Sequence, residues 1–133
     1  MEKVLGRFAH LIYAALRIVS GFLFACHGAQ KLFGALGGFG GTPGAKAPMF
    51  ELLWFGGVIE LIGGLLVTIG FRSSLAAFVC SGQMAVAYFV FHQPRGPLPI
   101  QNGGELAALY AFVFLYLAAR GPGILSVDGG AKG

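Results

Sequence analysis

Four apolar segments take up most of the chain, at about residues 8–27, 51–71, 73–92 and 103–119. A helix that spans the hydrocarbon core of a bilayer needs roughly 20 residues. A chain of 133 residues therefore has room for four such helices and short connections. None of the segments alternates strictly between apolar and polar residues, which disfavours β-strands. The sequence predicts an all-α fold, a four-transmembrane-helix antiparallel bundle forming one integral membrane domain over residues 1–133.

Charged residues make up only 11% of the chain, whereas a soluble domain carries about 25%. This excludes an ordinary soluble domain, and the high apolar content excludes an intrinsically disordered chain. The nine basic residues are spread over the sequence and form no run, so nucleic acid is not an expected partner. The expected partner is the lipid bilayer.

The connections between the apolar segments predict the topology. Residues 34–48 are rich in Gly and Pro and disfavour a regular helix, while residues 92–104 contain three prolines and form a stiff loop. With four spans, both termini and the turn at Arg72 share one side. That side carries five basic residues, Lys3, Arg7, Arg72, Arg120 and Lys132, against three on the other, Lys31, Lys46 and Arg95. The excess predicts cytoplasmic termini. A cleavable signal peptide is a weaker alternative, because Arg17 interrupts its apolar region.

Two charged residues lie near the middle of the apolar segments. Such a residue at the centre of a spanning helix costs about 2.5–3.5 kcal/mol on insertion scales, so it usually has a partner or a function. Arg17 and Glu60 each lie near the middle of a segment, and the two helices are antiparallel neighbours. We therefore expect Arg17 and Glu60 to pair inside the bundle, as a structural clamp or as part of a functional site. Glycines flank Glu60 on one helix face, Gly56, Gly57, Gly63 and Gly64.

A second group of polar residues gathers at the opposite end of the bundle from the termini. It consists of His27, Gln30, Lys31, His92, Gln101, Asn102 and Glu105. Gln83, midway along the third segment, connects this rim to the level of Arg17 and Glu60. The sequence thus predicts a polar funnel that binds a ligand through Arg17, Glu60, Gln83, His27, Gln30, Lys31, Asn102 and Glu105, with Glu60 as the candidate catalytic residue. The structural alternatives are an interface anchor for Lys31 and a helix-dipole contact for Glu105.

Cofactor and metal signals are weak. Cys26 and Cys80 fall at different depths, so we expect two separate thiols rather than a disulfide. His27, His92 and Glu105 make a thin case for a metal site, and no metal is expected. The sequence has no haem-attachment motif, nucleotide loop or nucleophile elbow.

Three stretches carry a resemblance to a known family. Arg17 followed by GFLFACHGAQKLFG (21–34), ELIGGLLVTIGFRSSLAA (60–77) and NGGELAALYAFVFLYLAARGPGILSVD (102–128) resembles the DoxX family of four-helix membrane proteins. The resemblance implies a bundle in the bacterial cytoplasmic (inner) membrane. It also implies a link to redox chemistry with quinone as acceptor, or to redox-stress complexes. The family's recurrent polar positions match Arg17, His27, Gln30, Lys31, Glu60 and Glu105. The Cys-x-x-Cys of some redox-active relatives is absent, which puts a dithiol mechanism in doubt.

Three functions follow as hypotheses, and whether the chain has catalysis of its own stays open. The first is a redox-linked subunit that binds quinone in the funnel, beside Trp54, Phe55, Tyr88 and Tyr110, with electrons supplied by a partner. The second is a non-catalytic accessory subunit that packs against a protein partner or a second copy. Its motivation is the small size of the chain, its long outer loops and its stripes of small residues, among them Ser73, Ala77, Ser81 and Ala85. The third is a transporter of protons or a small solute.

Overall fold

The computed structural model describes residues 1–129, and all regular structure there is helical. Lys132, counted above in the charge balance, lies outside the described residues. In chain order the elements are α1 (Glu2–Leu5), η1 (Gly6–Phe8), α2 (Ala9–Phe33), η2 (Phe39–Gly41), α3 (Leu52–Ile69), α4 (Ser73–Ala87), η3 (Tyr88–His92), η4 (Gln93–Arg95), α5 (Pro99–Asn102) and α6 (Glu105–Arg120). The predicted all-α fold is confirmed over this range.

Three helical segments are long and apolar enough to cross a membrane, Glu2–Phe33, Leu52–Ile69 and Ser73–Arg95. The fourth long helix, α6, has 16 residues and a length of about 24 Å. That is short of the roughly 30 Å hydrocarbon core of a typical bilayer. The chain is thus a membrane protein with several apolar helices, and a fourth full span stays a prediction.

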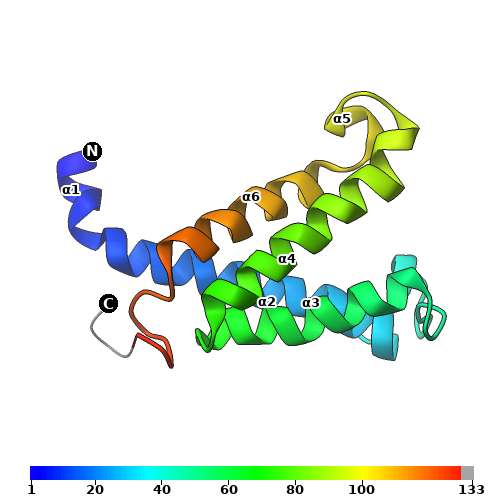
Figure 1. Cartoon of the computed structure of the whole chain (residues 1–133), viewed down its shortest axis with the longest axis horizontal. Helices are drawn as coiled ribbons and strands as arrows, with labels where there is room; N and C mark the ends of the chain where they lie inside the picture. The colour runs from blue at the N-terminus through cyan, green and yellow to red at the C-terminus, as the bar shows by residue number, and fades with distance from the viewer. Residues whose placement is uncertain (130–133) are drawn as a thin grey trace.

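The long helices form two antiparallel pairs (Figure 1). α2 packs along α3, α4 packs along α6, and the contact between α3 and α4 joins the pairs. The backbones of α2 and α6 lie further apart, and these two helices meet through side chains such as Phe24 and Phe114. The pairs lie together near the termini and the α3–α4 turn, and they spread apart towards the two long loops (Figure 1). This opening between the pairs positions the candidate site described below.

Two helical segments extend beyond the apolar segments. α2 continues to Phe33 because Gly28 is helical and no residue breaks the helix before Gly34, whose φ of 65° ends it in the left-handed conformation. The proline-containing loop is also partly helical, with η4 and α5 each starting beside a proline. Residues 34–48, in contrast, contain only the short η2, as their glycines and prolines predict.

Glycines bring α2 and α3 into close contact. A Cβ on Gly64 of α3 would lie 2.6 Å from the backbone nitrogen of Ala25, and one on Gly21 would lie 2.7 Å from the carbonyl oxygen of Gly64. A Cβ on Gly28 would collide with the backbone of Leu61 and Gly57. Only glycine permits the two backbones to approach this closely, so these residues fix the register of the pair.

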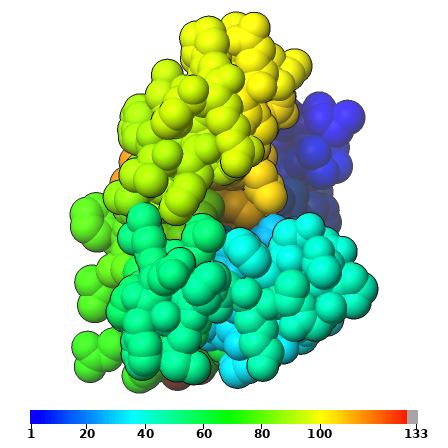
Figure 2. Space-filling view, turned by 90° about the vertical axis from the view of Figure 1, so that its right-hand side faces the viewer, coloured from blue at the N-terminus to red at the C-terminus, as the bar shows by residue number. Residues whose placement is uncertain are grey.

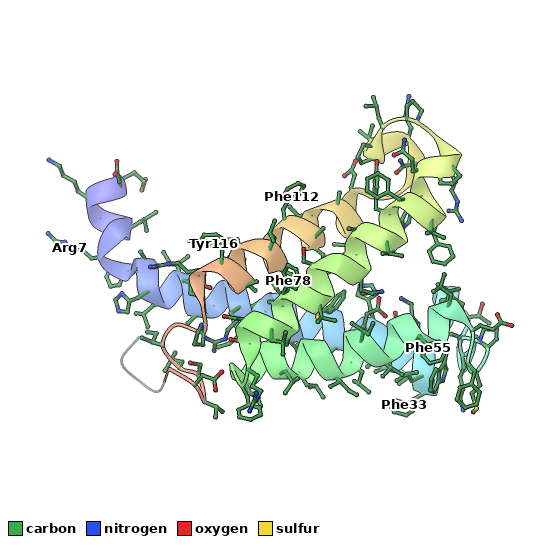
Figure 3. All side chains as sticks on the ribbon, in the orientation of Figure 1. Arg7, Phe33, Phe55, Phe78, Phe112 and Tyr116 are labelled. Carbon is green, nitrogen blue, oxygen red and sulfur yellow. The ribbon has the colours of Figure 1, made fainter. Side chains whose placement is uncertain are left out.

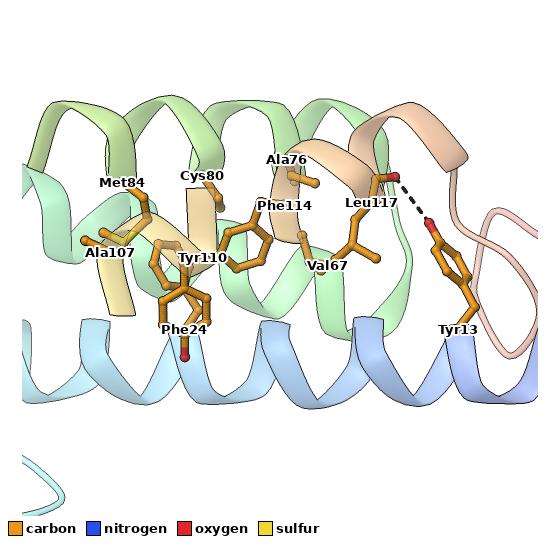
Figure 4. Close-up of a cluster of buried hydrophobic side chains, with 11 residues drawn as sticks. Tyr13, Phe24, Val67, Ala76, Cys80, Met84, Ala107, Tyr110, Phe114 and Leu117 are labelled. Atoms are coloured by element: carbon orange, nitrogen blue, oxygen red, sulfur yellow. Dashed lines mark hydrogen bonds between the residues drawn. The ribbon is translucent and has the colours of Figure 1, made fainter. Parts of the chain in front are cut away.

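The core lies where the two helix pairs meet (Figure 4). Phe24 and Phe114 are almost fully buried, with ring centroids 4.7 Å apart, and Tyr110 stacks on Phe114 at 5.4 Å. The predicted stripe of small residues also serves this core, since the Ser81 hydroxyl donates to the carbonyl of Ala111 at 2.7 Å. Cys26 and Cys80 are separate free thiols, as predicted.

Large apolar side chains cover the outside of the bundle. Phe33, Phe55, Phe78, Phe112 and Tyr116 point outward from the helices (Figure 3). Phe78 is 62% exposed and Phe112 72% exposed. Surface of this kind on a long apolar helix is suited to contact with lipid chains.

The glycine contacts predict a selective effect on stability. Gly28→Ala and Gly64→Ala each force α2 away from α3, and we expect each to lower the free energy of unfolding by about 1–3 kcal/mol. Gly82→Ala is the matched control, because a Cβ there meets no atom within 4 Å. Since alanine favours helix over glycine, this variant should be as stable as the parent or slightly more so. Unfolding in mixed detergent measures all three, and equal losses would contradict the assigned contact.

Candidate functional site

Lys31 and Glu60 form a part-buried ion pair. The Lys31 Nζ donates to Oε1 and to Oε2 of Glu60, both at 2.7 Å. The Glu60 side chain is only 2% exposed and that of Lys31 is 17% exposed. The two groups lie between α2 and α3, at the end where the helix pairs spread apart. The Glu60 charge is thus neutralised by the neighbouring helix, at a depth where an unpaired carboxylate would be costly.

The predicted pairing of Arg17 with Glu60 is wrong. The register set by the glycines places Arg17 against the C-terminal end of α3, where its Nε donates to the carbonyl of Val67 at 3.1 Å. Val67 is seven residues from Glu60, which is about 10 Å along the helix. The two apolar segments therefore do not align at their midpoints, and Lys31 takes the position expected for Arg17.

Arg17 instead holds the C-terminal tail against the bundle. Its Nη1 donates to the carbonyls of Pro122 and of Ile124, the latter at 3.0 Å, and its Nη2 donates to that of Leu125 at 2.6 Å. The side chain is 1% exposed. The tail is also tied to the end of α3, since the backbone N–H groups of Val127 and Asp128 donate to the carbonyls of Ile69 and Gly70. Backbone dipoles, rather than a carboxylate, satisfy this buried guanidinium.

A cleft of about 560 Å³ lies between the two helix pairs and opens at the end with the long loops. Figure 2 looks onto this end and shows a hollow between the yellow-green end of α4 and the cyan loop that follows α2. Its volume lies within the range of roughly 300–1,000 Å³ typical of small-molecule sites. The cleft is lined by residues of α2, α3, α4 and α6.

Polar groups converge on one wall of this cleft. They are His27 and Lys31 from α2, Glu60 from α3 and Gln83 from α4. The amide nitrogen of Gln83 lies beside Gly56, one turn before Glu60. The amide oxygen of Gln83 is buried and accepts no hydrogen bond from any of residues 1–129. An acceptor of this kind is costly to leave unpaired. Gln83 lines the cleft, so a rotation of its amide would turn this oxygen towards a ligand that donates a hydrogen bond.

Aromatic and apolar side chains form the rest of the cleft. Phe24 and Tyr110 line it, with ring centroids 5.2 Å apart, and the ring of His27 meets Tyr110 edge-on at 6.4 Å. Leu106 and Ala107 of α6 add an apolar side. The cleft therefore combines a polar wall with apolar surfaces that suit a flat molecule.

The predicted ligand residues divide between this cleft and other places. His27, Lys31, Glu60 and Gln83 line the cleft, and Arg17 lies at the far end of the bundle. Three more have structural surroundings or face outward. Gln30 donates to the carbonyl of Leu36 at 2.9 Å, Asn102 holds the loop by bonding to Tyr88 and Gly96, and Glu105 is exposed at the start of α6. The structure thus brings half of the proposed group together.

Aromatic residues at the cleft also differ from those expected. Tyr110 lines it, whereas Trp54 and Phe55 pack with Phe50 and with each other, and Tyr88 contacts Asn102. Sequence reasoning missed Phe24, Phe91 and Arg95, which also line the cleft. Helical spacing could have found one of them, because Phe24, His27 and Lys31 share one face of α2.

Metal ligands do not gather at this site. Over residues 1–129 no three His, Cys, Asp or Glu side chains lie close enough together to hold a metal ion. His27 and His92 both line the cleft, but Glu105 does not join them.

Comparisons with known proteins identify the class to which this bundle belongs. The DoxX family model matches residues 12–93, which include most of α2, all of α3 and α4, and all four polar residues of the cleft wall. The chain belongs to the DoxX family. It is 39% identical over 128 residues to an uncharacterized protein of Haemophilus influenzae (strain ATCC 51907 / DSM 11121 / KW20 / Rd), and the alignment covers 93% of each chain. No solved structure matches the chain.

The unequal exposure of Lys31 and Glu60 predicts unequal losses of stability. Lys31→Met leaves a carboxylate buried without a partner, and we expect it to cost about 3–5 kcal/mol. Glu60→Met should cost less, because the longer Lys31 side chain can extend towards water at the cleft mouth. The double variant should recover most of the loss. Unfolding of the four proteins in detergent tests this, and a double variant no more stable than Lys31→Met would contradict it.

The Arg17 contacts predict that the tail depends on this one side chain. Arg17→Leu leaves several buried carbonyls unpaired and should lower the free energy of unfolding by about 3 kcal/mol or more. Hydrogen exchange at the amides of Val127 and Asp128 should become faster at the same time. Arg7→Leu, which changes an exposed arginine, is the control. Unchanged protection of the two amides in Arg17→Leu would disprove the role of Arg17.

Proposed function

We propose that this DoxX-family protein is a redox-linked membrane subunit that binds a quinone, or a similar flat apolar molecule, in the cleft between its helix pairs. The observation that carries the proposal is the Lys31–Glu60 pair in the lining of the same cleft as Gln83, whose buried amide oxygen has no partner among residues 1–129. The cleft is large enough for a quinone ring, and its opposite sides are aromatic and apolar.

The polar groups on the wall differ in whether they can donate a hydrogen bond to a quinone or accept one from it. Lys31 Nζ uses two bonds on Glu60, so its remaining N–H can donate to a quinone carbonyl, as can the ring of His27. The Gln83 oxygen can only accept, so it suits the hydroxyl of the reduced form. The wall therefore offers partners to both oxidation states.

Reduction of a quinone to a quinol takes up two electrons and two protons. We assign to this chain the binding of the ring and the delivery of one of the two protons: Glu60, next to Lys31, takes up a proton from water at the cleft mouth, passes it to a ring oxygen and returns to the carboxylate form. The second proton comes from water. The electrons come from a partner protein that carries a redox centre. The location in the bacterial inner membrane, with both termini in the cytoplasm, is part of the same proposal.

The other two functions have less support from the geometry. The stripe of Ser73, Ala77, Ser81 and Ala85, one of the features that motivated an accessory subunit, is largely buried in the bundle and contacts α6 through Ser81. A transporter would need a path past the tail that Arg17 fixes at the other end of the bundle. Quinone binding in contrast uses groups that already face the cleft.

Quinone binding can be followed through the single tryptophan. Trp54 is next to Leu53, which lines the cleft, so a bound short-chain quinone should quench its fluorescence. We expect saturable quenching of the protein in nanodiscs, with the dissociation constant raised about 3- to 10-fold by Gln83→Leu, the loss of roughly one hydrogen bond. Glu60→Gln should weaken binding and slow quinone reduction when a partner supplies electrons.

Matched controls separate the cleft from the membrane around it. Gln101→Leu and Glu51→Gln make the same chemical changes at exposed positions outside the cleft and should leave the dissociation constant unchanged. Quenching that never saturates, or that all four variants affect equally, would rule out a quinone site in this cleft.

A further inference from the structure

A second pocket, of about 460 Å³, lies at the opposite end of the molecule from the cleft. It is formed where α2 begins, α6 ends and the tail folds back. Its lining residues are His10, Tyr13, Arg120, Pro122, Gly123, Ile124 and Gly129. Because the spread between the helix pairs is at the other end, this pocket is separate from the proposed quinone site (Figure 1).

The pocket carries the positive charge of Arg120. The Arg120 guanidinium lies over the ring of Tyr13, 5.7 Å from its centroid, and the Tyr13 hydroxyl donates to the carbonyl of Gly121 at 2.6 Å. No acidic side chain lines the pocket, and within residues 1–129 Arg120 forms no ion pair. His10 supplies a second nitrogen group. Among residues 1–129, the Arg120 cation therefore has no anionic partner.

An apolar groove of about 370 Å³ adjoins this pocket, and the two share Tyr13. The groove is lined mainly by Leu5, Ala9, Ile12, Leu16 and Tyr116, with Glu2 at its outer end. Along α2 it runs from the helix start towards Leu16, and on α6 it reaches Tyr116, one turn before Arg120. A charged pocket at the end of the bundle therefore continues into a groove that leads towards its middle.

We propose that this pocket and groove bind an anionic phospholipid. Arg120 and His10 take the phosphodiester of the head group, and one acyl chain lies in the groove against Ile12, Leu16 and Tyr116. An arginine at the membrane surface attracts an anionic lipid by about a factor of five. The groove distinguishes a lipid from a free phosphate, which has no chain to place there. This site is independent of the quinone proposal.

A structural role for Arg120 is the competing explanation. A cation in the last turn of α6 interacts favourably with the helix dipole, and its position over Tyr13 adds a cation–π contact. Either effect would stabilise the protein in any lipid. The lipid site, in contrast, requires that the effect of Arg120 depend on the charge of the head group.

Native mass spectrometry of the full chain in detergent measures this dependence. The protein is titrated with phosphatidylglycerol and with phosphatidylcholine of the same acyl chains. We expect one phosphatidylglycerol to bind more tightly than phosphatidylcholine, with its dissociation constant raised about fivefold by Arg120→Gln. His10→Asn, a change at an exposed position, should have a smaller effect in the same direction. Arg7→Gln is the matched control, because Arg7 points away from the bundle at the same end (Figure 3).

The outcomes separate the explanations. Equal losses in Arg120→Gln and Arg7→Gln would show attraction to surface charge alone and overturn the proposal. Competition by soluble glycerol 1-phosphate at the same concentration as the lipid would show a free phosphate site instead. If Arg120→Gln lowers thermal stability equally with both lipids and leaves lipid binding unchanged, the residue is structural. Selective loss in Arg120→Gln and His10→Asn supports the site.

Discussion

The close contact between α2 and α3 determines where two cations of the bundle, Arg17 and Lys31, find their partners. Gly21, Gly28 and Gly64 allow the two backbones to touch, and this permits one register of the helices. In that register Lys31 meets Glu60, and Arg17 lies beside the end of α3. A shift by one turn would separate Lys31 from Glu60 by more than a salt bridge spans. Close packing and charge pairing thus support the same alignment.

Most of the fold could be predicted from apolar segment length and from Gly and Pro in the connections. The helices, the short turn at Arg72, the irregular residues 34–48 and the separate cysteines all follow from local sequence. The spread of the two helix pairs could not be predicted, because it depends on side-chain packing between segments far apart in the chain. The extension of α2 to Phe33 was missed because the apolar segment ends near residue 27, whereas the helix continues for several polar residues beyond it.

The candidate site could be predicted in part. His27, Lys31, Glu60 and Gln83 stood out as polar residues near or within apolar segments, and they do line one cleft. The predicted partner of Glu60 was wrong, because an alignment of the two segments at their midpoints ignores the helix register that the glycines impose. The surroundings of Arg17 could not be foreseen, since its acceptors are backbone carbonyls of a tail that returns to the bundle. A carboxylate can be recognised in the sequence as a candidate partner. Backbone carbonyls occur at every residue, so the sequence does not single out those that accept from Arg17.

The difference between the two ends of the bundle determines how a small molecule can enter and leave it. At one end Arg17 and the tail close the space between the helices, and at the other end the cleft is open. A molecule that enters the cleft must therefore leave by the same entrance, unless the arginine releases the tail. This geometry is that of a binding site with one opening and not of a channel through the bundle. It favours a protein that binds and releases a small molecule on the same side.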